Sequence, residues 1–430
     1  MRELNVPALA RVEGDGGITV TLEGKKVKSV TLDVHEGPRL IEQLVRGMTP
    51  ADDLNVVPRI CAICTLSHKF AAIRGLEKAL GITPPEKAQL TRELMMLGEN
   101  VESNSLHTFL LALPDFLGYP SAIAMLNDFG DDVKRALRLK KFGNHVMEVT
   151  SGRIVHGENP IIGGFGKYPS KKSLEEIKLR SRELVPDAAR AVELFATVVE
   201  YPEYPESEKM VFMSVNAPKK KYGYHGDTIL ISNGKETSAE DYKKLTNERV
   251  VPHSFAKRSL FNEKPFTVGA NARMVNMGKR LDGQAADLFK EHFNDKWLVN
   301  PLYNNLAQAI EMLWSMEHLP EACDQVAALG DPAIEQPTRQ TGSGTGAVEA
   351  PRGTLYHHYE IKDGLIDVAD IITPTAQNLD DIELHMKITA ERMLADDKSD
   401  AEVRLGLEMV ARAYDPCISC ATHLVNLKRI

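Results

Sequence analysis

The sequence predicts an α+β fold that is predominantly α, with a core of long helices and peripheral β-hairpins. Two patterns predict this mixture. Apolar and polar residues alternate near both ends of the chain, as in half-buried strands, whereas apolar residues between them recur every three or four positions, as in helices. The length would allow two or three domains. No clear linker divides the chain, however, so we expect residues 1–430 to form a single domain.

Three segments have the signature of strands joined by tight turns. Ile18–Val34 (ITVTLEGKKVKSVTLDV) alternates around a Gly-Lys turn, which predicts a β-hairpin. Gly353–Ile372 repeats the pattern around Asp363-Gly364, a dipeptide typical of hairpin turns. Between them, Asp227–Ser232 followed by Asn233-Gly234 predicts a short strand and turn.

Helical spacing of apolar residues marks three long segments. Proline lacks a backbone N–H and disfavours continuation of a helix, so each segment is expected to end at or before a proline. The segments are Leu90–Val101, running on to Pro114; Leu302–Leu313, before Pro320; and Val403–Val410, ending at Asp415-Pro416.

Two glycine-rich segments invite comparison with phosphate-binding loops. Gln340–Gly346 (QTGSGTG) lacks the G-x-G-x-x-G spacing and leads toward a strand-like run, so we expect a loop. Gly163–Pro169 (GGFGKYP) has Tyr168 where a P-loop needs Ser or Thr to hold magnesium. Neither segment predicts a nucleotide site.

Composition excludes several classes of protein. Hydrophobic residues make up 43% and charged residues 26%, as in ordinary globular proteins, and the net charge of −8 argues against nonspecific nucleic-acid binding. Lys219–Lys221 is therefore interpreted as a solvated loop. The N-terminus lacks the apolar core of a signal peptide, and no run of 18 apolar residues could span a membrane. We expect a soluble, cytoplasmic protein.

The five cysteines carry the strongest chemical signal. Four of them form two C-x-x-C pairs, Cys61 with Cys64 and Cys417 with Cys420, at opposite ends of the chain. Cys323, within EHLPEACDQVAAL, is predicted to be a small core residue on a helix. An odd number of cysteines in so long a chain does not indicate a disulfide framework.

Spacing alone leaves three interpretations of the two pairs open. Four thiolates could hold a structural zinc, although zinc knuckles usually draw their ligands from a short stretch and these pairs lie more than three hundred residues apart. Each pair could instead be a redox dithiol, but the sequence before Cys61 gives little support for the required βαβ pattern. Alternatively, the fold joins both pairs in one centre of a thiophilic metal such as nickel.

The motifs around the cysteines strongly resemble those of the large, catalytic subunit of nickel–iron hydrogenases. The resemblance spans nearly the whole chain and is most like the cytoplasmic multi-subunit branch, whose members pass electrons to nicotinamide cofactors, sulfur, deazaflavin or ferredoxin. The matching motifs are Arg11–Gly14, Arg59–His68 (RICAICTLSH), Arg153–Gly164, Ala350–Gly353, Ile371–Thr375 and Asp415–His423 (DPCISCATH).

Two alternatives compete with a catalytic hydrogenase subunit. The relative found in respiratory complex I has lost the metal, but it lacks the cysteine pairs that are intact here. A non-catalytic subunit with a four-cysteine zinc site is the other alternative.

The resemblance implies a nickel–iron centre with carbon monoxide and cyanide on the iron. Cys61 and Cys417 match the terminal nickel ligands, and Cys64 and Cys420 match the ligands that bridge nickel to iron. The implied reaction is reversible heterolytic cleavage of dihydrogen. Two metal ions would also neutralise four buried thiolates.

Further residues match the catalytic groups and surroundings of that centre. Cys417 and Arg352 are alternative candidates for the first base, and Glu13 matches the glutamate that relays protons away from the terminal cysteine. His68 matches a histidine that hydrogen-bonds a bridging sulfur. The remaining matches are Thr375, after Pro374, as hydroxyl donor to an iron-bound cyanide, and Asp415 as a contributor to the local field or a helix cap.

The resemblance also implies a magnesium site and several partners. Glu42, the backbone carbonyl of Ile371 and His423 match the magnesium ligands. Iron–sulfur clusters are expected only in partners: a small subunit, contacted near the first cysteine pair and His156, and further diaphorase or flavin subunits. Residues 424–430 resemble the extension that a maturation endopeptidase removes.

Overall fold

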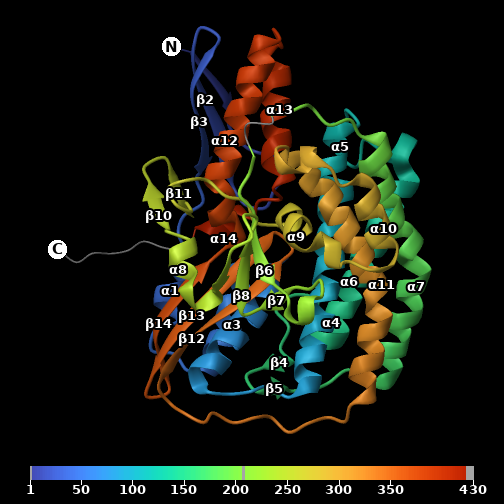
Figure 1. Ribbon diagram of the computed structural model, residues 1–430, viewed down its shortest axis with the longest axis vertical. Coiled ribbons are helices and arrows are strands. Elements are labelled where there is room, and N and C mark those ends of the chain that lie inside the picture. Colours follow the sequence, from blue (N-terminus) through green and yellow to red (C-terminus); the bar gives the residue numbers. More distant parts are fainter. Residues whose placement is uncertain (1, 206–208, 423–430) are drawn as a thin grey trace, which may run out of the picture.

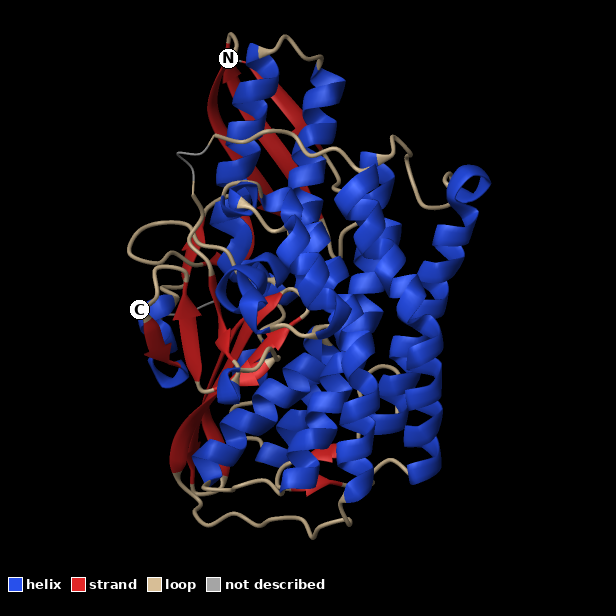
Figure 2. Cartoon of the chain, turned by 45° about the vertical axis from the view of Figure 1, so that its right-hand side comes forward, coloured by secondary structure: helices blue, strands red, loops and turns tan. Residues whose placement is uncertain are grey.

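The computed structural model describes residues 2–205 and 209–422, and it has a helical side and a strand-rich side (Figures 1 and 2). The helices are α1 (Ile41–Leu44), α2 (Pro50–Val56), α3 (Thr65–Leu80), α4 (Glu86–Ser105), α5 (Leu113–Phe116), α6 (Leu126–Ser151), α7 (Lys171–Glu193), α8 (Tyr242–Leu245), α9 (Ala270–Met277), α10 (Gly283–His292), α11 (Asn304–Ala328), α12 (Pro374–Ala395), α13 (Asp400–Ala413) and α14 (Ile418–Ala421). The predominantly α, α+β class is confirmed.

The strands form small antiparallel sheets rather than one large sheet. They are β1 (Arg2–Val6), β2 (Gly16–Glu23), β3 (Lys26–Val34), β4 (Pro160–Ile161), β5 (Gly164–Phe165), β6 (Met213–Asn216), β7 (His225–Gly226), β8 (Thr228–Ile231), β9 (Glu236–Ser238), β10 (Arg249–Val251), β11 (Ser254–Arg258), β12 (Gly342–Ala350), β13 (Gly353–Lys362) and β14 (Leu365–Ile372). Their orders are β1-β2-β3, β14-β13-β12-β7 and β6-β8-β9, with β4-β5 and β10-β11 as separate pairs.

The long helices α4, α6, α7 and α11 pack side by side in the helical part (Figure 1). Their apolar faces, together with α3, build the larger hydrophobic core, which also contains the four cysteines of the two C-x-x-C pairs. A second core lies between the β1-β2-β3 sheet and helices α12 and α13. None of the helices in the described residues has the length and apolar character that a bilayer crossing requires.

Helix α3 lies across strands β12 and β13 at unusually short range, and this contact explains a wrong prediction. Residues 342–346, expected as a loop, belong to strand β12. A Cβ added at Gly346 would lie 2.0 Å from the Ala71 carbonyl oxygen, and one at Gly344 would lie 2.6 Å from that of Gly75. The glycines therefore serve close backbone packing within a strand, not turn formation.

The predicted hairpins are confirmed. β2 pairs with β3 and β13 with β14, in both cases antiparallel and around the expected turns. The short strand β8 and the helix α13 also lie where their sequence patterns predict them. Cys323 is buried on α11, as expected, and Lys219–Lys221 is exposed.

Two prolines do not end helices as predicted. Pro114 lies in the first turn of α5, which continues the helical path of α4 through a π-helical segment, Leu106–Ala112. Proline is tolerated in a first turn because its missing N–H is not needed there. Pro320 lies inside α11, whose later residues Cys323 and Val326 are buried in the core, so tertiary packing continues the helix past the proline.

Candidate metal centre

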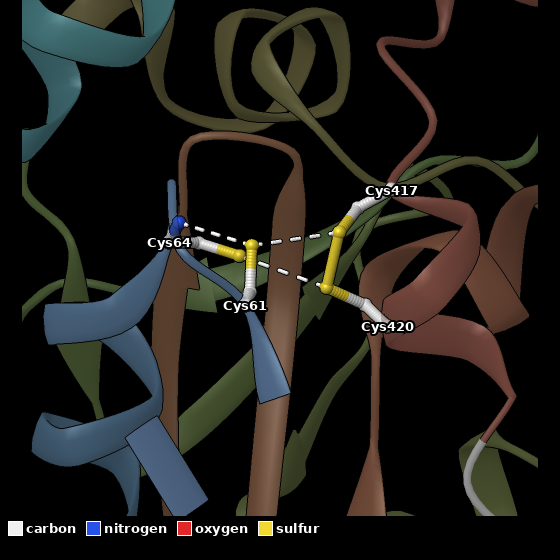
Figure 3. A group of neighbouring side chains, drawn as sticks. All are labelled: Cys61, Cys64, Cys417 and Cys420. Carbon is white, nitrogen blue, oxygen red and sulfur yellow. Dashed lines mark hydrogen bonds between the residues drawn. A yellow bond between two sulfur atoms is a disulfide. The ribbon is translucent and has the colours of Figure 1, made fainter. Parts of the chain in front are cut away.

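The two C-x-x-C pairs meet in one buried pocket (Figure 3). Cys61 Sγ lies 3.5 Å from Cys417 Sγ, and Cys64 Sγ lies 3.9 Å from Cys420 Sγ, although each of these pairings joins residues 356 positions apart. All four sulfurs lie within 4.8 Å of one another. Cys417 and Cys420 are joined by a disulfide, whereas Cys61 and Cys64 are free.

This arrangement fits a thiolate-bound metal. Tetrahedral metal–sulfur bonds of about 2.3 Å would separate the sulfurs by roughly 3.8 Å, close to the distances between the two pairs. Binding requires all four cysteines as thiolates, so the disulfide must be reduced when a metal is held. The donor set therefore fits the nickel–iron centre that the sequence predicts, and it would equally fit zinc.

Local backbone structure presents the sulfurs to one another. Cys64 precedes the first turn of α3, and its backbone N–H donates to Cys61 Sγ at 3.2 Å. This pair of thiols is asymmetric: the hydrogen bond from Cys64 lowers the pKa of Cys61, and together with burial it raises the pKa of Cys64. Cys417 precedes α14, and its N–H donates to Thr375 Oγ1 at 2.9 Å.

Glu13 links the N-terminal region to the second cysteine pair. The Cys417 thiol position lies 3.0 Å from Glu13 Oε2, and the Ser419 N–H donates to the same oxygen at 3.2 Å. The Ser419 hydroxyl donates to Glu13 Oε1. The Ile418 N–H also donates to the Glu13 carbonyl at 2.8 Å, which fixes the backbone of one segment on the other. The carboxylate is thus held by Ser419 and directed at Cys417.

Arg352 and Asp415 form a buried ion pair beside the cysteines. Arg352 Nε donates to the Asp415 carbonyl at 2.8 Å, and Nη2 lies 3.0 Å from Asp415 Oδ1. Gln308 Nε2 donates to Asp415 Oδ2 at 3.1 Å. Burial lowers the pKa of Arg352, but Asp415 and the cysteine thiols outweigh this effect and hold it above the ordinary value.

One guanidinium nitrogen of Arg352 is not used by these contacts. Arg352 Nη1 is buried and has no hydrogen-bond partner among the described residues. A buried donor without a partner is costly unless another group satisfies it. Asp415 has a positive φ of 50°, so the chain turns sharply just before Pro416 and Cys417.

Glu99 caps the helix that begins after Cys64. Its Oε1 accepts from the Leu66 N–H at 2.7 Å, and its Oε2 accepts from the Ser67 N–H at 2.9 Å and from the Ser67 hydroxyl. Burial raises the pKa of Glu99 to about 8 despite these bonds. A buried acid at the N-terminus of α3 therefore fixes the direction in which the first cysteine pair enters the helix.

The predicted magnesium ligands lie partly within the described residues. Glu42 Oε1 accepts from the Ile371 N–H at 2.6 Å and lies 3.4 Å from Lys257 Nζ. Glu42 Oε2 is buried with no partner among the described residues, as expected for an oxygen that binds a cation. Burial raises the pKa of Glu42 to about 7, although Lys257 opposes this effect. His423 lies outside the described residues, as do residues 424–430.

The other predicted residues have defined places. His68 Nδ1 lies 3.0 Å from His357 Nε2, and Pro374 begins α12 next to Thr375. His156 Nδ1 lies 3.0 Å from the Thr65 hydroxyl, directly beside the first cysteine pair. Its neighbours Ile154 and Val155 are exposed apolar residues, as an interface requires.

Sequence reasoning missed several residues of the site. Ser419 lies inside the second C-x-x-C spacer and holds Glu13, and Gln308 orients Asp415 from α11. Neither has a distinctive sequence signal. Glu99 does: it is a charged residue on a helix whose neighbours Met95, Met96 and Val101 are all buried apolar residues. A carboxylate in such a setting usually has a specific partner.

Comparisons with known proteins agree with this geometry. A family model described as "Nickel-dependent hydrogenase" matches residues 39–127 and 214–423. The alpha chain of sulfhydrogenase 1 from Pyrococcus furiosus is 39% identical over 99% of this chain and 98% of its own length. The corresponding chain of the vhc F420-non-reducing hydrogenase from Methanococcus voltae is 29% identical over 99% and 96%, respectively.

Solved structures share the fold. The crystal structure of an NAD+-reducing [NiFe]-hydrogenase in the H2-reduced state superposes with a TM-score of 0.89 and 26% identity, covering 98% of this chain and 100% of that one. The Ni-Fe-Se hydrogenase of Desulfovibrio vulgaris Hildenborough superposes with a TM-score of 0.79 at 22% identity, over 98% and 100% of the two chains.

Proposed function

The chain belongs to the nickel-dependent hydrogenase family, and we propose that it is the catalytic subunit of a cytoplasmic, multi-subunit nickel–iron hydrogenase. In this proposal Cys61 and Cys417 are terminal nickel ligands, and Cys64 and Cys420 bridge nickel to an iron that carries carbon monoxide and cyanide. The bound centre supplies reversible heterolytic cleavage of dihydrogen to protons and electrons. The convergence of the four buried sulfurs supports this assignment.

Glu13 receives and passes on the proton in this proposal. Its Oε2 lies 3.0 Å from Cys417 Sγ, which is within direct proton-transfer distance of a terminal thiolate. Ser419 donates two hydrogen bonds to the carboxylate and therefore keeps it in position while the proton arrives and leaves. This contact between Glu13 and Cys417 is the single observation that carries the proposed function.

Arg352 acts by charge and position. Asp415 fixes the guanidinium through two contacts, which leaves Nη1 as an unused buried donor. Such a donor can polarise a small substrate in a pocket that excludes water. Because a guanidinium is difficult to deprotonate, we assign the first base to Cys417 rather than to Arg352.

The surroundings of the iron are assigned by the same argument. Thr375 accepts from the Cys417 N–H through Oγ1, so its own hydroxyl hydrogen remains available to an iron-bound cyanide beside Pro374. His68 donates to the bridging Cys64 or Cys420 sulfur. Glu42, Ile371 and His423 hold magnesium, with Lys257 as a neighbouring cation that lowers the charge of the site.

Electron transfer requires partners. Only Cys323 lies outside the four-sulfur cluster, so the chain has too few cysteines for an iron–sulfur cluster of its own. We propose an iron–sulfur small subunit that contacts the region around His156, and diaphorase or flavin subunits beyond it. NAD(P), ferredoxin or sulfur is the proposed acceptor, by analogy with the named sulfhydrogenase and NAD+-reducing relatives. A maturation endopeptidase removes residues 424–430.

An assay of the matured complex tests this function. We expect dihydrogen-dependent reduction of a viologen dye and exchange of deuterium gas with water protons, both abolished by Cys417→Ser. Cys323→Ser is the matched control, because Cys323 is equally buried but lies away from the cluster. Absence of both activities in a complex that contains nickel and iron would refute the proposal.

A further inference from the structure

Four buried polar side chains form a continuous chain leading away from the cysteine pocket. His68 Nδ1 lies 3.0 Å from His357 Nε2, and His357 Nδ1 lies 3.0 Å from the Tyr359 hydroxyl oxygen. The Tyr359 hydroxyl lies 2.8 Å from Asp53 Oδ2. The four residues come from α3, β13 and α2, and each is at most 1% exposed.

Tight packing between α3 and β13 creates this chain. His357 and Tyr359 point to the same face of β13 because they are two positions apart. Gly75 on α3 meets them directly: a Cβ there would lie 2.6 Å from the His357 carbonyl oxygen and 3.1 Å from the Tyr359 ring. His68, two helical turns before Gly75, is thereby held against His357.

The end of the chain is an acid without a counter-charge. Asp53 Oδ1 is buried and has no hydrogen-bond partner among the described residues, and the only described partner of Oδ2 is Tyr359. An ionised carboxylate in such a place would be buried and unpaired, which strongly favours the neutral acid. Burial accordingly raises the pKa of Asp53 to about 7.

The two histidines are neutral, so each ring carries one hydrogen. Burial lowers the pKa of His68 to about 3 and places that of His357 well below its ordinary value. In a chain of neutral groups every link needs one donor and one acceptor. The direction of the first link therefore determines all the others.

Only two arrangements of hydrogens satisfy every link. If Asp53 is ionised, Tyr359 donates to it, His357 donates to Tyr359 through Nδ1, and His68 donates to His357 through Nδ1, which leaves Nε2 of His68 without a hydrogen. If Asp53 is a neutral acid, it donates to Tyr359 and each link reverses. The hydrogen of His68 then lies on Nε2.

We propose that Asp53, Tyr359 and His357 are positioning residues that fix the Nε2–H tautomer of His68. The inference rests on the proposed function, in which His68 donates a hydrogen bond to a bridging sulfur. That donation must use Nε2, because Nδ1 faces His357. The chain from Asp53 thus decides whether His68 presents a hydrogen or a lone pair to the sulfur, and so the electron density that the sulfur gives to the iron.

Infrared spectra of the matured complex test this role with matched variants. Tyr359→Phe removes the described partner of His357 Nδ1 and releases the tautomer. We expect the iron-bound carbon monoxide band to move to lower wavenumber or to split, because a sulfur that loses a hydrogen bond donates more charge. Asp53→Asn keeps an N–H donor toward Tyr359 and should leave the band in place.

Tyr356→Phe is the matched control. Tyr356 lies on the same strand, is equally buried, and its hydroxyl has no partner among the described residues. Its removal should leave the band unchanged. An unchanged band in Tyr359→Phe, or an equal shift in Tyr356→Phe, would overturn the inference. Absence of carbon monoxide and cyanide bands in the wild-type complex would instead refute the proposed function.

A second measurement needs no metal. Nitrogen-15 NMR of the full chain labelled at histidine, with His68 assigned by His68→Gln, reports which ring nitrogen carries the hydrogen. We expect Nε2–H in the wild-type chain and a mixture of tautomers in Tyr359→Phe. A wild-type His68 with its hydrogen on Nδ1 would overturn the inference, even if no variant can be loaded with metal.

Discussion

Glu13 and Arg352 place a carboxylate and a guanidinium at the same cysteine pocket, and each is held by its own partner. Ser419 fixes Glu13 against Cys417, whereas Asp415 fixes Arg352. The two side chains differ in what they can do. A carboxylate can take up and release a proton near neutral pH, but a guanidinium keeps its charge and contributes by electrostatics.

Glu13→Gln tests the proton route. Glutamine keeps the size of the side chain but cannot carry the proton, so the metals should be retained while turnover and deuterium–proton exchange fall by about 10²-fold or more. Metal analysis and gas exchange check the two halves of this prediction. Glu23→Gln, at an exposed position of β2, is the control. Unchanged exchange in Glu13→Gln would remove Glu13 from the route.

Arg352→Lys tests the geometry of the guanidinium. Lysine keeps the positive charge but cannot make both contacts with Asp415, so we expect dye reduction to fall by about 10²-fold with nickel retained. Arg258→Lys changes another buried arginine, which pairs with Glu383 away from the cluster, and should leave activity near wild type. Equal losses in both variants would show a general packing effect instead.

Asp53 predicts a pH dependence of stability. Its pKa rises from 3.8 to about 7 on folding, so its contribution to stability is complete below about pH 4 and is lost as the pH rises through 7. Asp53→Asn cannot ionise. Relative to wild type it should gain up to about 4 kcal/mol between these pH values, measured by urea unfolding of the metal-free chain. A difference that does not change with pH would contradict the pKa.

Single residues were predictable where their sequence pattern is chemically distinctive. The cysteines are such a case, because two C-x-x-C pairs are a strong signal in any context. Glu13 and Arg352 could be assigned only through the family resemblance, since an acid near a glycine or an arginine after a proline has many ordinary explanations. Asp53, His357 and Tyr359 could not be found, because only the packing of α3 on β13 brings them together.

Among the elements, the crossing of α3 over β12 and β13 determines how the pocket is built. Glycines on the strand allow the helix backbone to approach, and the same helix carries Cys64 at its start and His68 one turn later. Sequence patterns identified the helix and both strands of the β13–β14 hairpin. They misassigned residues 342–346, because glycine-rich sequence is typical of loops and the approaching helix is invisible in the sequence.

Gly346→Ala tests this close approach. The added methyl group would lie 2.0 Å from the Ala71 carbonyl, so helix and strand must separate, and the free energy of unfolding should fall by about 3 kcal/mol. Gly330→Ala is the control, because nothing lies within 4 Å of a Cβ at that exposed position. The midpoints of urea unfolding check both variants. Equal midpoints for Gly346→Ala and wild type would show that α3 does not pack this closely.

For the whole molecule, the decisive feature is that both ends of the chain contribute to one pocket. The N-terminal region supplies Glu13, Cys61 and Cys64, and the C-terminal region supplies Cys417 and Cys420. Spacing alone left a zinc site and two separate dithiols open, since it contains no distance between the two pairs. The fold places the pairs together, and membership of the hydrogenase family identifies nickel as the metal to expect.

The most direct test of this account is X-ray absorption at the nickel edge, with metal analysis, on the matured complex. We predict one nickel per chain with sulfur as its principal neighbour, and loss of that nickel when either Cys61 or Cys417 is changed to serine, while Cys323→Ser retains it. Zinc in place of nickel, or nickel that survives the loss of either terminal cysteine, would contradict a centre shared by both pairs.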